Sequence, residues 1–160
     1  MMFIIFSWLL YSSTATAHDF SEHWISVSLY KNTIRIKATP PIDQFLQFDA
    51  DSNGWLCQQE LLQFKAEIQK QFESQVSVLN EHATPATFQW KDVTFHPNTQ
   101  HRHLSMHLVG KWEQDITNKI SLRYAHLDSS NVGLFIRANQ EVTHQTIPPE
   151  KKMSYLLLRK

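Results

Sequence analysis

Residues 49–60 carry the side chains whose types and spacing best suit metal chemistry. The segment runs Asp-Ala-Asp-Ser-Asn-Gly-Trp-Leu-Cys-Gln-Gln-Glu, with oxygen-bearing side chains at alternate positions before a glycine and a glutamate at its end. Calcium is a hard cation that takes about six to eight oxygen ligands, and a tightly wound loop of this pattern supplies them. We therefore expect a calcium site. Its ligands would be the side chains of two aspartates, an asparagine and a glutamate with one tryptophan backbone carbonyl: Asp49, Asp51, Asn53, Glu60 and Trp55.

Two further positions in the loop bear on how tightly it would bind. Gly54 allows the sharp turn that directs the ligands inward. Cys57 stands where a bridging water usually lies and offers no hard oxygen. No second loop of this pattern is present, because the segment 128–133 lacks the required residues. We expect weak binding, with Kd of about 10⁻⁴ to 10⁻³ M, by a structural calcium rather than a signalling one. The alternative is an acidic, solvated loop that binds no metal.

Hydrophobic periodicity predicts the elements on either side of the loop. Alternation over Trp24–Tyr30 and Ile34–Ala38, interrupted by a short polar turn, predicts a β-hairpin. Helical spacing predicts a short helix before the loop, N-capped by Thr39, and one longer helix after it. The longer helix carries apolar side chains from Leu61 to Phe72.

From about residue 75 onward the period returns to two, which predicts further strands. They are expected around Phe88–Trp90, Val93–Phe95, Leu104–Leu108, Ile120–Tyr124, Val132–Ile136 and Met153–Leu158. The outline predicts an α+β, mainly β domain spanning residues 18–160. Its expected architecture is an antiparallel β-sandwich with the helix–loop–helix inserted after the second strand, at about 39–74. A partly open barrel is the structural alternative.

Composition excludes several classes of function. The 15 basic and 15 acidic residues cancel, whereas a nucleic-acid-binding protein needs a basic face. The three glycines are too widely spaced for a phosphate-binding loop. The single cysteine excludes an intrachain disulfide and a cysteine-rich metal site. Neither a G-x-S-x-G nor an H-E-x-x-H motif occurs, so we expect a protein that is not an enzyme and has no nucleic-acid partner.

The first residues of the chain predict export. Residues 1–11 are almost continuously apolar, and Ala15-Thr16-Ala17 fits an A-x-A cleavage site. A signal peptide is therefore expected at residues 1–17, with a mature chain that begins at His18 in the periplasm or outside the cell. An uncleaved anchor is the alternative. No later apolar stretch is long enough to span a bilayer, so no transmembrane segment is expected in the mature chain.

The Asp49–Glu60 segment resembles the calcium-binding loop of EF-hand proteins. Together with Ala17-His18 and the Trp24–Ala38 hairpin, it also resembles the extracytoplasmic amino-terminal region of hydrogenase/urease accessory-type (HupE/UreJ) membrane proteins. The second resemblance implies an extracytoplasmic accessory or interaction domain with an envelope or membrane protein as its partner.

Histidines suggest a competing function. The chain has 9 of them, and His101, His103 and His107 would share one face of a strand. With His18 at the new amino terminus, they could serve a protein that handles copper, zinc or nickel. The alternative is a solvated strand face, because three side chains along one strand span too far to bind one ion.

Overall fold

The computed structural model describes residues 23–96, 103–113, 119–124, 132–138, 141–147 and 153–158. The expected signal peptide at 1–17, His18 and His101 lie outside these ranges. Strands dominate the described residues, which confirms a mainly β chain, and the helices lie between the second and third strands. The elements are, in order, β1 (Trp24–Tyr30), β2 (Thr33–Ala38), the 3₁₀-helix η1 (Ile42–Phe48), α1 (Gln58–Gln63), α2 (Lys65–Gln75), β3 (Val76–Leu79), β4 (Thr87–Phe95), β5 (Leu104–Lys111), β6 (Lys119–Tyr124), β7 (Val132–Ala138), β8 (Glu141–Ile147) and β9 (Met153–Leu158).

The first two strands form the predicted hairpin. They pair antiparallel along their length, and Lys31 in the turn between them has a φ of 51°. The alternate apolar side chains of the two strands form one buried face, each at most 1% exposed: Ile25, Val27, Ile34, Ile36 and Ala38. The side chains between them point to the opposite face, as the period of a strand requires.

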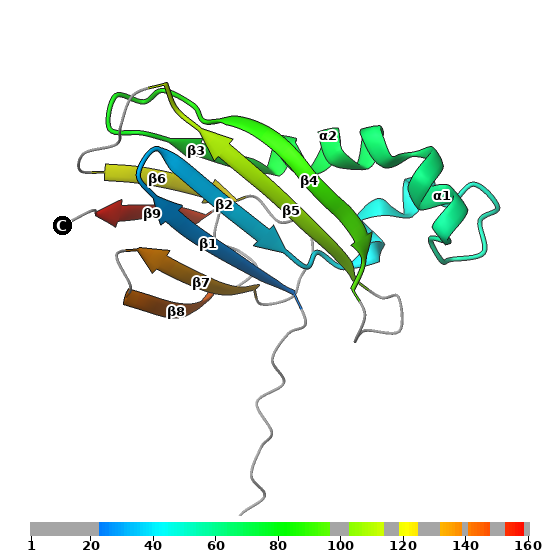
Figure 1. Cartoon of the computed structure of the whole chain (residues 1–160). Helices are drawn as coiled ribbons and strands as arrows, with labels where there is room; N and C mark the ends of the chain where they lie inside the picture. The colour runs from blue at the N-terminus through cyan, green and yellow to red at the C-terminus, as the bar shows by residue number, and fades with distance from the viewer. Residues whose placement is uncertain are drawn as a thin grey trace, which may run out of the picture.

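The hairpin lies at the centre of a six-stranded sheet with the order β4-β5-β2-β1-β7-β8 (Figure 1). The expectation of a wholly antiparallel arrangement is wrong, because β1 pairs with β7 in parallel. Parallel neighbours need a long crossover connection, and the chain between these two strands includes the helices and the strands β2 to β6. Alternation of apolar residues along a strand does not carry information on the direction of its neighbour.

A second, three-stranded sheet has the order β3-β6-β9, and Figure 1 shows it behind the six-stranded sheet. One cluster of buried apolar residues joins the two sheets and the helices. It includes Met106 and Leu108 of the large sheet, Leu122 of the small one, and Ile68 and Phe72 of α2, all fully buried. No helix within the described ranges has the length and apolar character needed to cross a membrane.

The helices differ in detail from the prediction. The first is a 3₁₀-helix that begins after Pro41, which provides no side-chain cap. Thr39 is not its N-cap, because the hydroxyl of Thr39 accepts a hydrogen bond from the backbone N–H of Trp24 at 3.0 Å. The expected single helix after the loop is two helices, since Phe64 leaves helical geometry with φ −103° and ψ 19°. The ring of Phe64 packs against that of Phe48 at 5.7 Å between centroids, which holds the end of η1 against this junction.

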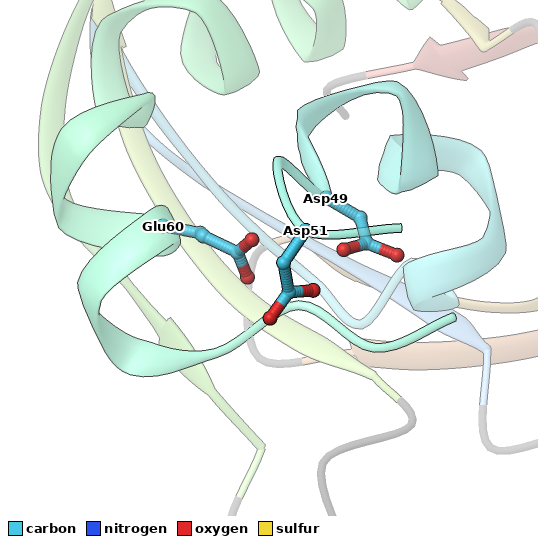
Figure 2. Close-up of side chains that lie close together, drawn as sticks. All are labelled: Asp49, Asp51 and Glu60. Atoms are coloured by element: carbon cyan, nitrogen blue, oxygen red, sulfur yellow. The ribbon is translucent and has the colours of Figure 1, made fainter. Parts of the chain in front are cut away.

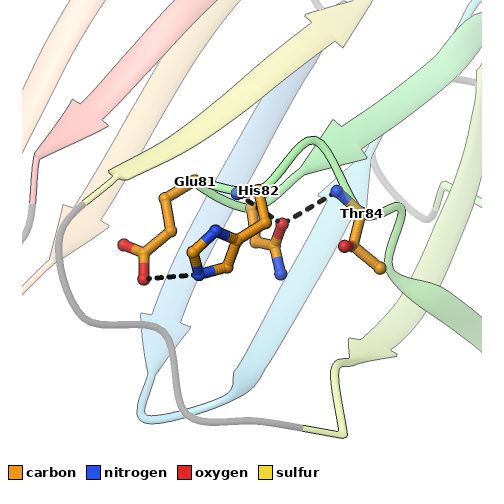
Figure 3. Close-up of polar contacts among 4 residues, drawn as sticks. Glu81, His82 and Thr84 are labelled. Atoms are coloured by element: carbon orange, nitrogen blue, oxygen red, sulfur yellow. Dashed lines mark hydrogen bonds and ion pairs between the residues drawn. The ribbon is translucent and has the colours of Figure 1, made fainter.

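The side chain of Asn80 closes the connection between β3 and β4. Figure 3 shows Glu81, His82 and Thr84 in this connection. The amide oxygen of Asn80 accepts hydrogen bonds from the backbone N–H groups of His82 and Thr84, at 3.0 Å and 2.8 Å. His82 also lies 3.5 Å from the carboxylate of Glu81. Short polar side chains commonly organise turns in this way, so these contacts are sufficiently explained by the fold.

Candidate metal centre

The loop that carries the predicted ligands lies between η1 and α1. Asp49 is the C-cap of η1, directly after its last residue, and Cys57 is the N-cap of α1. Glu60 lies in the first turn of α1, where its side chain and the backbone of Cys57 form a capping box. Figure 2 shows the carboxylates of Asp49, Asp51 and Glu60 turned toward the same small space. The ends of two helices thus fix the ends of the loop.

Glu60 is held by both of its carboxylate oxygens. Oε1 accepts a hydrogen bond from the backbone N–H of Ala50 at 2.7 Å, and Oε2 accepts one from the N–H of Cys57 at 2.8 Å. The side chain is buried, at 5% exposure. These two bonds join the start of the loop to its end, so Glu60 closes the loop even before any ion is considered.

Asp49 and Asn53 organise the turn of the loop. The Asp49 carboxylate accepts hydrogen bonds from the N–H of Gly54 at 2.7 Å and from the N–H of Asn53 at 3.3 Å. The Asn53 amide group donates to Asp51 at 2.8 Å, and its oxygen accepts from the N–H of Trp55 at 2.8 Å. Gly54 has a φ of +83°, a conformation that favours glycine. The loop therefore wraps its N–H groups around its own carboxylates.

The structure brings three of the five predicted ligand residues together. One oxygen from each of Asp49, Asp51 and Glu60 lies within 4.8 Å of the others. Calcium–oxygen distances are about 2.3–2.6 Å, so two ligands on opposite sides of one ion lie about 5 Å apart. The spacing of the three carboxylates fits a cation of this kind. Asn53 is joined to Asp51 by its hydrogen bond, and Trp55 presents an indole that is 54% exposed.

Hydrogen bonding lowers the pKa values of two of these carboxyl groups. For Glu60, the N–H of Cys57 is the main cause, and it lowers the pKa below the usual value for glutamate. For Asp49, desolvation raises the pKa, but hydrogen bonds from the N–H of Gly54 and its neighbours lower it by more. Both groups are therefore more acidic than in an unfolded chain, and the loop favours their charged forms.

This difference predicts how acid affects the calcium-free protein. A carboxyl group whose pKa is lower in the folded than in the unfolded chain stabilises the folded protein at pH values above its unfolded-state pKa. This stabilisation is lost as the pH falls through its folded-state pKa. We therefore expect the unfolding free energy without calcium to fall as pH decreases below about 4. Urea unfolding in the presence of a chelator, at pH values from 6 to 3, measures this change in the unfolding free energy. A stability that rises over that acidic range would contradict the inferred role of Asp49 and Glu60.

Of the histidines in the alternative metal site, the structure describes only His103 and His107. His107 lies on β5, and His103 forms an isolated bridge with Pro41 just before that strand. Within the described residues, the only group of three or more potential metal donors is the carboxylate cluster. His18 and His101 lie outside the described residues.

Three hydrogen bonds at the site were not predicted from the sequence. The backbone N–H groups of Ala50 and Cys57 hold Glu60, and the sulfur of Cys57 accepts from the N–H of Glu60 at 3.5 Å. Cys57 therefore caps α1. The sequence does contain a signal for this cap. Glu60 follows Cys57 by three residues at the start of a helical pattern, which is the spacing of a capping box.

No protein-family model matches the chain, and no match to it was found among the curated proteins. The EF-hand and accessory-protein resemblances therefore stay predictions. The case for a function rests on the residues of the loop and on their geometry.

Proposed function

We propose that this protein binds one structural calcium ion through an EF-hand loop at residues 49–60. The observation that carries the proposal is the convergence of Asp49, Asp51 and Glu60, whose oxygens lie within 4.8 Å of one another in a loop with calcium-binding spacing. Asn53 and the backbone carbonyl of Trp55 would supply the remaining protein ligands. Oxygen donors of this kind suit calcium better than copper, zinc or nickel.

The role of the ion follows from where the loop lies. Asp49 and Asp51 follow η1, whereas Glu60 belongs to α1, so one bound ion would link the two helical segments. Calcium would also offset two of the three negative charges on carboxylates that repel one another when they are ionised. The ion would thereby brace the helix–loop–helix against a β-sandwich built from the two sheets. This is a stabilising role in which no groove opens and no reaction is catalysed.

We further propose that the domain works outside the cytoplasm as an accessory or interaction module for an envelope protein. The apolar run and the A-x-A site in residues 1–17 support export. Calcium concentrations outside cells can saturate a loop with Kd of about 10⁻⁴ to 10⁻³ M, whereas such weak binding is of little use in the cytosol. A structural calcium site of low affinity is consistent with a location outside the cytoplasm.

Titration of the purified protein tests the proposal. After removal of metals with a chelator, isothermal calorimetry is expected to show one calcium site per chain. Calcium at ten to a hundred times Kd would stabilise the fold by about 1.4–2.7 kcal/mol, seen as a higher melting temperature. Magnesium is expected to bind more weakly because it demands a smaller octahedral shell. No heat and no melting shift at millimolar calcium would refute the proposal, as would stoichiometric copper, zinc or nickel in protein purified without chelators.

A further inference from the structure

The outward face of the six-stranded sheet has an unusual arrangement of charges around two serines. Ser26 and Ser28 of β1 point away from the core, since the residues between and beside them, Ile25 and Val27, are buried. On either side, β2 and β7 present longer side chains in register with the two serines. The short serine side chains thus form the floor of a trough on the open face.

The strand register places cations on both walls of the trough. Ser28 has Arg35 of β2 directly opposite on one side and Arg137 of β7 on the other. Ser26 has Lys37 of β2 on one side. Neighbouring strands are about 4.8 Å apart, so the backbones of β2 and β7 lie about 10 Å apart across β1. That width lets a small anion lie over the serines and reach cations from both walls.

An apolar end completes the trough. Phe135 of β7 lies opposite Ser26, and its ring meets that of Trp24 edge to face, with 6.4 Å between centroids. The ring of His144 on β8 stacks on Phe135 at 4.5 Å. The trough and its apolar end together form one groove with a volume of about 500 Å³. This groove is lined by Trp24, Ser26, Ser28, Lys37, Phe135 and Arg137, among others. A volume in this range is typical of sites for small organic ligands.

The three cations of the trough are Arg35, Lys37 and Arg137. Among the residues that the structure describes, no carboxylate forms an ion pair with Arg35, Lys37 or Arg137. The pKa of His107, which lies opposite Lys37, is affected by these charges. Desolvation lowers this pKa most, the positive charges of Lys37, Arg35 and Lys91 lower it further, and the negative charge of Asp92 raises it. The described cations on this part of the face therefore favour the approach of an anion.

We propose that this groove binds a small organic anion that carries an aromatic ring. The phosphate or carboxylate of such a ligand would lie between Lys37 and Arg137, where the hydroxyls of Ser26 and Ser28 can also donate hydrogen bonds. Its ring would pack against Trp24 and Phe135. Three cations on a protein of zero net charge make this face complementary to an anion, and the half-buried rings make it complementary to an aromatic one.

Calorimetry with three probes tests both halves of the proposal. The ligand 2-naphthyl phosphate has the ring and the charge, 2-naphthol has the ring alone, and inorganic phosphate has the charge alone. We expect the first to bind at least about tenfold more tightly than either of the others, because only it satisfies both parts of the groove. Equal affinity for naphthyl phosphate and naphthol, or for naphthyl phosphate and inorganic phosphate, would overturn the proposal.

Variants of the two cations assign the site. Lys37→Gln and Arg137→Gln are each expected to weaken naphthyl phosphate binding by about tenfold, through loss of a charge-assisted hydrogen bond. Both residues are exposed, so the variants keep the fold, and circular dichroism checks this. Lys70→Gln, an exposed lysine on α2, is the matched control and should bind as tightly as the parent. Unchanged affinity in both groove variants would overturn the proposal.

Calcium and lipid vesicles distinguish the groove from the calcium loop and from a membrane-binding surface. Affinity for naphthyl phosphate is expected to be the same in millimolar calcium and in chelator, because the groove shares no residue with the loop at 49–60. Failure of calcium binding would therefore leave this result intact. Binding to vesicles of anionic phospholipid without binding of free naphthyl phosphate would overturn the proposal in favour of a membrane surface.

Discussion

Glu60→Gln is expected to abolish calcium binding while both sheets stay folded. Each carboxylate oxygen of Glu60 now accepts a backbone N–H, one from Ala50 and one from Cys57. A glutamine has one oxygen and one NH₂ group, so it satisfies only one of these donors and opposes the other. It also removes one of the three negative charges that face the cation. The loop would lose ligand charge and its closing contacts together.

Calorimetry and circular dichroism of the same sample measure the two parts of this result. Heat of calcium binding should fall below detection at millimolar calcium, and the β-sheet spectrum should be unchanged. Glu67→Gln is the matched control, because Glu67 is an exposed glutamate on α2 outside the carboxylate cluster. That control should bind calcium like the parent. Retained binding in Glu60→Gln would contradict the assignment of Glu60 as a ligand.

Local patterns in the sequence were enough to place the strands of the hairpin and the last strand. β1 spans Trp24–Tyr30 and β9 spans Met153–Leu158, the ranges that alternation or an apolar run predicts. In both cases the signal lies within the strand itself, as alternation in β1 and as a short apolar run in β9. The loop was predictable for the same reason, since its ligands come from one short segment.

Features that depend on distant residues could not be predicted. The parallel pairing of β1 with β7 joins Trp24 to Gly133, and nothing local to either strand specifies it. The strand β8 was missed because its polar sequence lacks an apolar face, and Val142, Thr143 and His144 are all exposed at the edge of the sheet. Such a strand is held by backbone pairing with β7 rather than by burial.

In the candidate site, too, local features could be predicted from the sequence and features that depend on the folded backbone could not. Spacing along the chain placed Asp49, Asp51 and Glu60 in one loop, but not the backbone N–H groups that hold their oxygens. Those depend on φ and ψ, and the sequence signals an unusual backbone conformation only at Gly54, where a positive φ carries no steric cost. The groove on the outer face lay further beyond prediction, because Arg35 and Arg137 become neighbours only through the register of three strands.

Phe72→Ala is expected to lower the unfolding free energy by about 3–5 kcal/mol, the largest stability effect that we predict. Phe72 is fully buried where α2 meets both sheets. Its ring lies 6.1 Å from that of Tyr124 on β6 and 5.9 Å from that of Trp90 on β4, between centroids. Truncation would leave a cavity between α2 and the two sheets. Because the strands of each sheet are hydrogen-bonded to one another, the sheets cannot easily move to fill that cavity.

Urea unfolding at fixed calcium concentration measures this loss. Leu62→Ala is the control, since Leu62 of α1 is 63% exposed and its truncation should change stability by less than about 0.5 kcal/mol. A loss below about 1 kcal/mol in Phe72→Ala would show that α2 does not bridge the sheets as described. The folded variant should still bind calcium, because the contact between Phe48 and Phe64 and the bonds of Glu60 leave the loop held at both ends. Stability of the core and occupancy of the loop would then be separable properties of one domain.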